Sequence, residues 1–323
     1  MIVIIAKGDT VIFNFPLSIF NCGRQPAKPQ FPYPTGGRDM KADCHIHMVL
    51  DGENWKAAID SHRNGPDLSL IRQRLEGYAR AGFTYLRDGG DRWGVGAAAR
   101  ELAGEYGITY RTPLANLCCK GHYGGFIGLT YTNLREYKTL VRKTRKQGGD
   151  FIKIMISGIM DFDCFGRLSE EGLDPKLIRQ LIDIAHDEGF SVMAHANGAR
   201  TAEAAAEAGV DSIEHGAYLD GDALQAMREN GVIWCPTVSA IANLQGKGRF
   251  PDEQIGKIVG STAENLRRFA AMGGIIAPGS DAGAWAVPHG AGGTDEYRHL
   301  LDILGPEGEV VVNRGICCVM AKF

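Results

Sequence analysis

From residue 41 onward, short apolar runs alternate regularly with amphipathic stretches, and this alternation restricts the chain to few folds. Strands that alternate with helices form parallel sheets, because each helix carries the chain back before the next strand begins. The predicted strands are 40–47, 84–88, 108–117, 151–157, 191–195, 212–215, 232–237 and 274–281. The predicted helices are 68–81, 94–106, 133–147, 174–188, 199–208, 220–230, 252–272 and 295–304.

The number of strand and helix pairs favours one architecture within the α/β class. Several predicted helices end at a glycine that is followed by a new apolar run, as at Gly82, Gly189, Gly209 and Gly231, which is typical of helix C-termini. An open parallel sheet would also accommodate these elements, but the count favours a closed (β/α)8 TIM barrel. We therefore predict an α/β protein whose barrel spans residues 40–304.

Two terminal segments, 1–39 and 305–323, do not follow the alternation. Short apolar runs at 2–5 and 10–15 predict strands, and a connector rich in proline and glycine follows them. Residues 309–320 are also strand-like. We expect an N-terminal β segment with its linker (1–39) and a C-terminal β segment (305–323) that together form a reduced small β appendage to the barrel.

Composition and charge exclude several classes of protein. Hydrophobic residues make up 44% and charged residues 23% of the chain, which excludes a disordered or fibrous protein. The formal net charge is −3, without a run of like charges, so small molecules rather than nucleic acids are the expected partners. No apolar run approaches the ~20 residues of a membrane span, and the N-terminus lacks a basic signal-peptide region, which predicts a cytoplasmic protein. The 8 cysteines have no regular spacing and are expected to be free thiols, while homo-oligomer formation is left open.

Polar side chains stand at or near the ends of several predicted strands, where a (β/α)8 barrel carries its active site. They are His45, His47, Lys153, His195, His215 and Asp281. His45 and His47 are two residues apart on one strand, so both side chains point to the same face, as a pair of metal ligands requires. Each residue by itself has a simpler interpretation, such as a chance histidine pair, a hydrogen-bonded core histidine or an N-cap aspartate. Their joint placement favours one shared site.

Lys153 lies in the run 151–156, which otherwise predicts a strand buried on both faces. A buried ammonium group without a partner is costly. The lysine therefore needs a carboxylate partner, a stem long enough to reach water, or conversion by CO2 to a carbamate, an anionic oxygen ligand that can bridge two metal ions.

Five motifs, in order along the chain, resemble the amidohydrolase superfamily of metal-dependent hydrolases. They are Asp43-Cys-His-Ile-His47, Lys153 in its strand, Ala194-His-Ala-Asn-Gly198, Ile213-Glu-His-Gly216 and Pro278-Gly-Ser-Asp-Ala-Gly283. The similarity covers about residues 40–300 and is greatest to the imidazolonepropionase-like and Xaa-Pro dipeptidase (prolidase-like) branch. The run before His45 and the short segment after residue 304 depart from the family pattern, in which further strands complete a β-sandwich.

The resemblance implies a binuclear metal centre. His45, His47 and Asp281 would hold the first metal, His195 and His215 the second, and a carboxylated Lys153 would bridge them. Zinc is the expected metal, with Fe, Mn or Co as alternatives, and Asp281 would also be the catalytic base. The candidate substrate-binding residues are His122 and Tyr123 in a glycine-containing loop, and Tyr218 behind His215; a surface turn or a packing contact is the simpler interpretation of each.

The resemblance also implies hydrolysis of carbon–nitrogen bonds. We expect a metal-dependent amidohydrolase that cleaves the amide or peptide bond of a small substrate, such as an Xaa-Pro dipeptide or an N-acyl amino acid, with a metal-activated hydroxide. One alternative is a mononuclear, imidazolonepropionase-like hydrolase of cyclic amides, and another is a lactonase or phosphotriesterase with the same nucleophile. A non-catalytic metal-binding protein is the alternative from another class, although it would have no use for the general base Asp281.

Overall fold

Strand β1 (Lys41–Ile46) begins a series of parallel strands in the computed structural model, which describes residues 40–323. β1 pairs with β2 (Phe83–Asp88), and β2 pairs with β3 (Thr109–Arg111). A second series runs through β4 (Asn116–Cys119), β6 (Ile152–Met155), β7 (Val192–Ala196), β8 (Ser212–His215), β9 (Ile233–Cys235) and β10 (Ile275–Ile276). The short strand β5 (Leu129–Tyr131) extends from β4.

The two series join into one closed barrel. On one side, β3 and β4 are consecutive parts of a single predicted strand, which is interrupted at Pro113, a residue without a backbone donor, and at Leu114, whose φ is 66°. On the other side, the segment after β10 bonds to β1: the Cys44 amide donates to Pro278 O (2.8 Å), and the Asp281 amide donates to His45 O (2.8 Å). The predicted TIM barrel is therefore confirmed.

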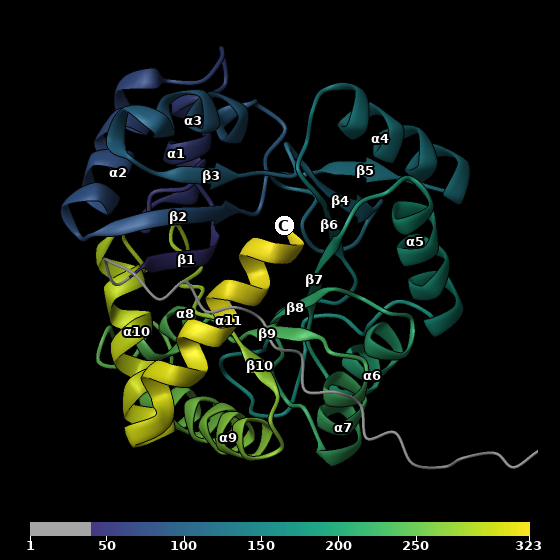
Figure 1. Ribbon diagram of the computed structural model, residues 1–323, viewed down its shortest axis with the longest axis vertical. Coiled ribbons are helices and arrows are strands. Elements are labelled where there is room, and N and C mark those ends of the chain that lie inside the picture. The colour runs from purple at the N-terminus through teal and green to yellow at the C-terminus, as the bar shows by residue number, and fades with distance from the viewer. Residues whose placement is uncertain (1–39) are drawn as a thin grey trace, which may run out of the picture. The chain divides into compact units, whose positions relative to one another are not determined.

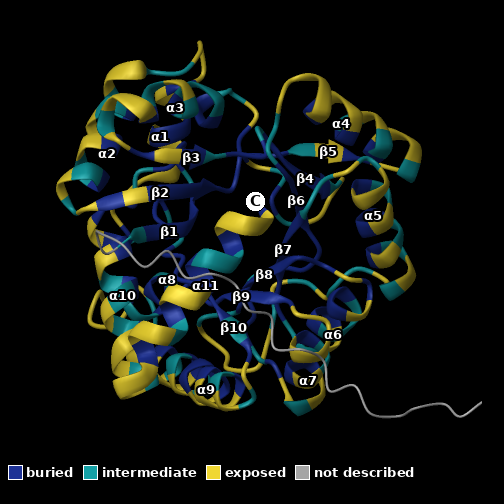
Figure 2. Cartoon of the chain, viewed as in Figure 1, coloured by how far each residue is buried: buried dark blue, intermediate teal, exposed yellow. Residues whose placement is uncertain are grey.

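Helices surround the strands, with their exposed residues on the outside (Figures 1 and 2). The predicted helices are present within a few residues as α2 (Leu68–Arg80), α3 (Val95–Ala103), α4 (Leu134–Lys146), α5 (Pro175–Asp187), α6 (Ala199–Glu207), α7 (Gly221–Glu229), α9 (Asp252–Ala271) and α10 (Ala291–Leu304). The short helices α1 (Trp55–Ser61) and α8 (Ser239–Ala242) were not predicted. Side chains of Asp67, Asn133, Asp174 and Asp220 accept backbone hydrogen bonds at the N-termini of four of these helices, which explains where these helices begin.

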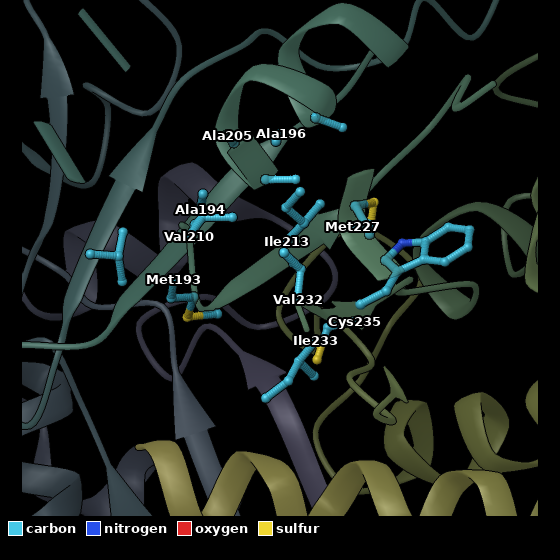
Figure 3. Packing of buried hydrophobic residues seen from close by; sticks show 14 of the residues in the cluster. Met193, Ala194, Ala196, Ala205, Val210, Ile213, Met227, Val232, Ile233 and Cys235 are labelled. Carbon is cyan, nitrogen blue, oxygen red and sulfur yellow. The ribbon is translucent and has the colours of Figure 1, made fainter. Parts of the chain in front are cut away.

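The core lies between the strands and the surrounding helices. All residues of β7 and β8 are buried, as expected for strands covered on both faces. Figure 3 shows part of this core, with Ile213 of β8 near Val210 and Met227, and with Met193 and Ile233 in the two neighbouring strands. This packing holds the strand ends, and the polar residues they carry, at defined positions.

The C-terminal segment is a helix, α11 (Gly308–Lys322), and the prediction of a β segment at 305–323 was wrong. The run of β-branched valines at 310–312 suggested a strand, but the buried residues Val312, Ile316 and Val319 recur at helical spacing. They pack into the same core cluster as Cys44 and Ile276 of the barrel. The strands predicted at 2–5 and 10–15 lie outside the described residues.

Helix α11 crosses the strands within the ring of helices, closely enough for backbone contact (Figure 1). A Cβ atom added at Gly315 would overlap the carbonyl group of Ile276 in β10, which cannot rotate away as a side chain would. We expect Gly315→Ala to lower the free energy of unfolding by about 1–3 kcal/mol, because one backbone segment must shift. Urea denaturation followed by circular dichroism measures the change.

Gly256→Ala is the matched control for this prediction. Gly256 also lies in a helix, α9, but a Cβ atom added there meets no other atom within 4 Å. The alanine should therefore raise the free energy of unfolding by about 0.5–1 kcal/mol, because an unfolded chain with alanine has less conformational freedom to lose than one with glycine. Equal stability of the two variants would contradict the close contact between α11 and β10.

Two further sequence predictions concern the whole chain. None of the helices between residues 40 and 323 is long and apolar enough to cross a bilayer. The seven cysteines in this range are free, as predicted. The cytoplasmic location stays a prediction.

Candidate metal centre

Three of the predicted ligands lie together where β1 and the segment after β10 end. His45 is fully buried, and the rings of His45 and His47 lie 5.3 Å apart between centroids. Asp281 Oδ1 is 3.6 Å from His45 Nε2 and 3.5 Å from His47 Nε2. One ligand atom from each residue lies within 4.8 Å of the others, a spacing that fits a single metal ion.

The other predicted ligands border the same place. The His215 ring lies 5.0 Å from that of His45 and 4.6 Å from that of His195, between centroids. Lys153, from the middle of β6, lines the same cavity as His47, His195, His215 and Asp281. The structure thus brings together all six residues that the sequence predicted as ligands.

Several buried nitrogen atoms in this cluster have no hydrogen-bond partner among the described residues. They are His45 Nε2, His47 Nδ1 and Lys153 Nζ. Buried polar atoms are nearly always paired, so unpaired atoms that converge on one cavity fit a site for a bound cation or a modified lysine. His195 Nε2 donates to Gly158 O (3.1 Å), which leaves its Nδ1 with a free lone pair.

The electrostatics of the site favour free lone pairs on its histidines. Burial, reinforced by the nearby ammonium of Lys153, lowers the pKa of His47 and of His195 to about 3, and the pKa values of the other two histidines are lowered as well. All four rings are therefore neutral at pH 7, as metal binding requires. Burial lowers the pKa of Lys153 to about 8 and raises that of Asp281 to about 7.

Two functional residues were missed by the sequence analysis. Glu214 Oε2 lies 2.6 Å from His45 Nδ1, and its other oxygen accepts from Arg87 Nη2 (2.9 Å). Glu214 and Arg87 are fully buried inside the barrel. When Nδ1 of a histidine donates to a carboxylate, the ring is fixed in the tautomer whose Nε2 can bind metal. Like Lys153, Arg87 and Glu214 are charged residues within predicted strands, and this is the sequence signal that could have identified them.

The structure places only one of the three candidate substrate-binding residues in the cavity. The Tyr123 ring lies 5.0 Å from the His195 ring and lines the cavity. The side chain of His122 is exposed, with Nδ1 3.3 Å from Glu170 Oε2, and does not line it. Tyr218 borders a second cavity, of about 930 Å³, beside the start of α6.

Comparison with known proteins identifies the family of the chain. The sequence profile described as "Amidohydrolase family" matches residues 71–295, more than half of the chain. Ochratoxinase of Aspergillus niger is 28% identical over an alignment of 231 residues that covers 62% of this chain and 47% of that protein. The chain thus spans about half the length of the curated relatives it matches.

Solved structures share the fold. A Xaa-Pro dipeptidase crystallised with methionine in its active site superposes with a TM-score of 0.68 at 22% identity, covering 88% of this chain and 75% of that one. The A. niger ochratoxinase structure superposes with a TM-score of 0.69 at 19% identity, covering 86% of this chain and 71% of that one. From the profile match, together with the six clustered residues, we conclude that the chain belongs to the amidohydrolase family.

Proposed function

We propose that the protein is a metal-dependent amidohydrolase that cleaves the amide or peptide bond of a small substrate, such as an N-acyl amino acid or an Xaa-Pro dipeptide. The observation that carries the proposal is the clustering of four histidines, a buried lysine and an aspartate at one cavity, which three of the histidines line, with buried nitrogen atoms left unpaired among residues 40–323. The names of the relatives, ochratoxinase and Xaa-Pro dipeptidase, support an amide substrate.

The residues present fit a divalent metal centre, because imidazole and carboxylate are ligands that zinc and its neighbours accept. His45, His47 and Asp281 would hold one ion, and His195 and His215 a second. A bound divalent metal would lower the pKa of a water molecule and polarise the carbonyl group of the scissile amide. Lys153 would join the two positions as a carbamate.

Two side chains have chemistry of their own in this proposal. Carbamate formation needs the neutral amine, whose nitrogen bonds to the carbon of CO2 as a proton leaves, and the lowered pKa of Lys153 makes that form accessible near neutral pH. Asp281, with a pKa raised to about 7, can accept a proton from the attacking water and pass it to the leaving nitrogen.

A substrate panel tests the proposed reaction. We expect protein loaded with zinc to hydrolyse N-acyl amino acids or Xaa-Pro dipeptides faster than lactones, aryl esters or phosphotriesters, and a chelator to abolish turnover. Preference for the lactones or phosphotriesters would replace the amide assignment, and metal uptake without any turnover would favour a non-catalytic protein.

Asp281→Asn tests the role of the base within the same assay. We expect turnover to fall by about 10²–10⁴-fold, because the amide cannot accept the proton. Asp302→Asn, on the exposed surface of α10, is the control and should retain full turnover. Retained turnover in Asp281→Asn would show that another group takes the proton.

A further inference from the structure

The walls of the cavity above the metal centre are mostly apolar. The cavity has a volume of about 730 Å³, and five of the six candidate residues, all but the fully buried His45, are among its lining residues. Its aromatic lining residues are Trp55, Tyr123, Phe126, Phe162, Phe250 and Trp285. Aliphatic side chains such as Leu50, Ile159 and Leu244 lie between them. This volume is in the range of sites for ligands well beyond the size of a small dipeptide.

Two of the aromatic residues leave a large part of their surface in water. Trp55 is 46% exposed and Phe126 is 37% exposed, and their rings form an edge-to-face pair with centroids 5.4 Å apart. Trp55 comes from α1 and Phe126 from the loop before β5, so two separate segments supply the pair. A pair of exposed aromatic rings beside a cavity is a surface that an apolar ligand would cover.

Another part of the cavity wall is also apolar and is held by packing. Phe162 and Phe250 lie 4.9 Å apart between ring centroids, and both pack against the buried cluster that contains Met160 and Leu244. The guanidinium of Arg249 lies 4.8 Å from the centre of the Trp285 ring. These contacts fix the shape of the wall before any ligand arrives.

The charged residues of the lining do not provide a buried partner for a ligand charge. Away from the metal centre they are Glu53, Asp161, Asp163 and Arg249. Three of these are exposed, and Asp161 lies 3.8 Å from Arg167. Solvated charges discriminate weakly between ligands, so apolar contact area is what this cavity offers for selection.

We propose that the substrate is an amide whose acyl group is apolar and about the size of a bicyclic aromatic ring, rather than a small dipeptide. The inference rests on the proposed amide hydrolysis and specifies its substrate class. A small acyl group would leave the exposed Trp55–Phe126 pair in water, whereas a bicyclic one has more apolar surface to cover it.

The first experiment compares two substrates that release the same amine, N-(2-naphthoyl)glycine and N-acetylglycine, on the holoenzyme. We expect kcat/KM to be higher for the naphthoyl compound by about 10-fold or more. The double variant Trp55→Ala/Phe126→Ala should lose most of this ratio, because kcat/KM should fall further for the naphthoyl compound than for N-acetylglycine. Phe165→Ala is the matched control, since Phe165 is similarly exposed (43%) but does not line this cavity.

A binding measurement separates this inference from the proposed function. Calorimetry compares 2-naphthoate with acetate on the holoenzyme; both are carboxylates, and neither can be hydrolysed. Tighter binding of naphthoate than of acetate, reduced in the double variant and unchanged in Phe165→Ala, supports the apolar subsite. This conclusion holds even if no amide is cleaved, because the absence of cleavage would refute only the proposed function. Equal binding of the two carboxylates, or cleavage of N-acetylglycine as efficient as that of the naphthoyl compound, would overturn the inference while the amidohydrolase assignment stands.

Discussion

Replacing Lys153 with alanine will lower the metal content of the purified protein from about two ions per chain to one or none, and amide hydrolysis will fall with it. Lys153 is 1% exposed, its Nζ atom has no hydrogen-bond partner among residues 40–323, and it lines the same cavity as His47, His195 and Asp281. Substitution of residues that only hydrogen-bond to metal ligands lowers metal affinity or activity by about 10–100-fold. The loss of a group that itself bridges the metals is therefore expected to lower turnover by at least ~100-fold.

The measurement is the metal content of protein purified in the presence of bicarbonate, determined by plasma mass spectrometry beside turnover of the best amide. Lys176→Ala, on the outer surface of α5, is the control and should bind as much metal as the native chain. One ion per chain that is unchanged in Lys153→Ala would contradict the bridge and favour the mononuclear mechanism.

Replacing Glu214 with alanine will destabilise the fold by about 3–5 kcal/mol and weaken metal binding as well. The change leaves the Arg87 guanidinium buried without its carboxylate partner. The remaining partners of Arg87 among residues 40–323 are neutral: Cys44 O at 2.7 Å, Ser212 Oγ at 3.0 Å and Cys235 Sγ at 3.4 Å. It also removes the acceptor of His45 Nδ1, so the ring loses the contact that fixes its tautomer.

A comparison of variants tests whether the unpaired buried charge of Arg87 causes the destabilisation. Arg87→Leu/Glu214→Leu removes both charges and should be less destabilised, by urea denaturation, than Glu214→Ala, because no ion remains unpaired. Glu264→Ala, at an exposed position of α9, should leave the unfolding midpoint unchanged. If Glu214→Ala is as stable as Glu264→Ala, the pair contributes little to the fold. The double variant also lacks the carboxylate that contacts His45 Nδ1. Weaker zinc binding by this variant than by the native chain would therefore still show that Glu214 orients His45.

The sequence predicted the barrel well and singled out six residues that the structure brings together, because both depend on local pattern. Strand and helix periodicities are visible within a few residues, and a histidine or aspartate at a strand end can be recognised wherever the strand itself can. Prediction was poorest in α11, where β-branched valines favour a strand but the buried residues recur at helical spacing. It also failed at Arg87 and Glu214, which are buried charged residues within strands. The substrate-contact role of His122 and Tyr218 stays a prediction, and neither side chain lines the cavity.

The sequence by itself determined the order and type of the barrel elements and the residues that could bind metal, since these follow from side-chain periodicity and donor chemistry. Only the tertiary structure decided how the barrel closes, because β10 has two residues and the seam depends on hydrogen bonds between segments more than 230 positions apart. Only the tertiary structure also showed that Trp55, Phe126 and Trp285 share one cavity. These residues lie on separate segments, and their distances depend on the packing of the whole chain rather than on any pattern within it.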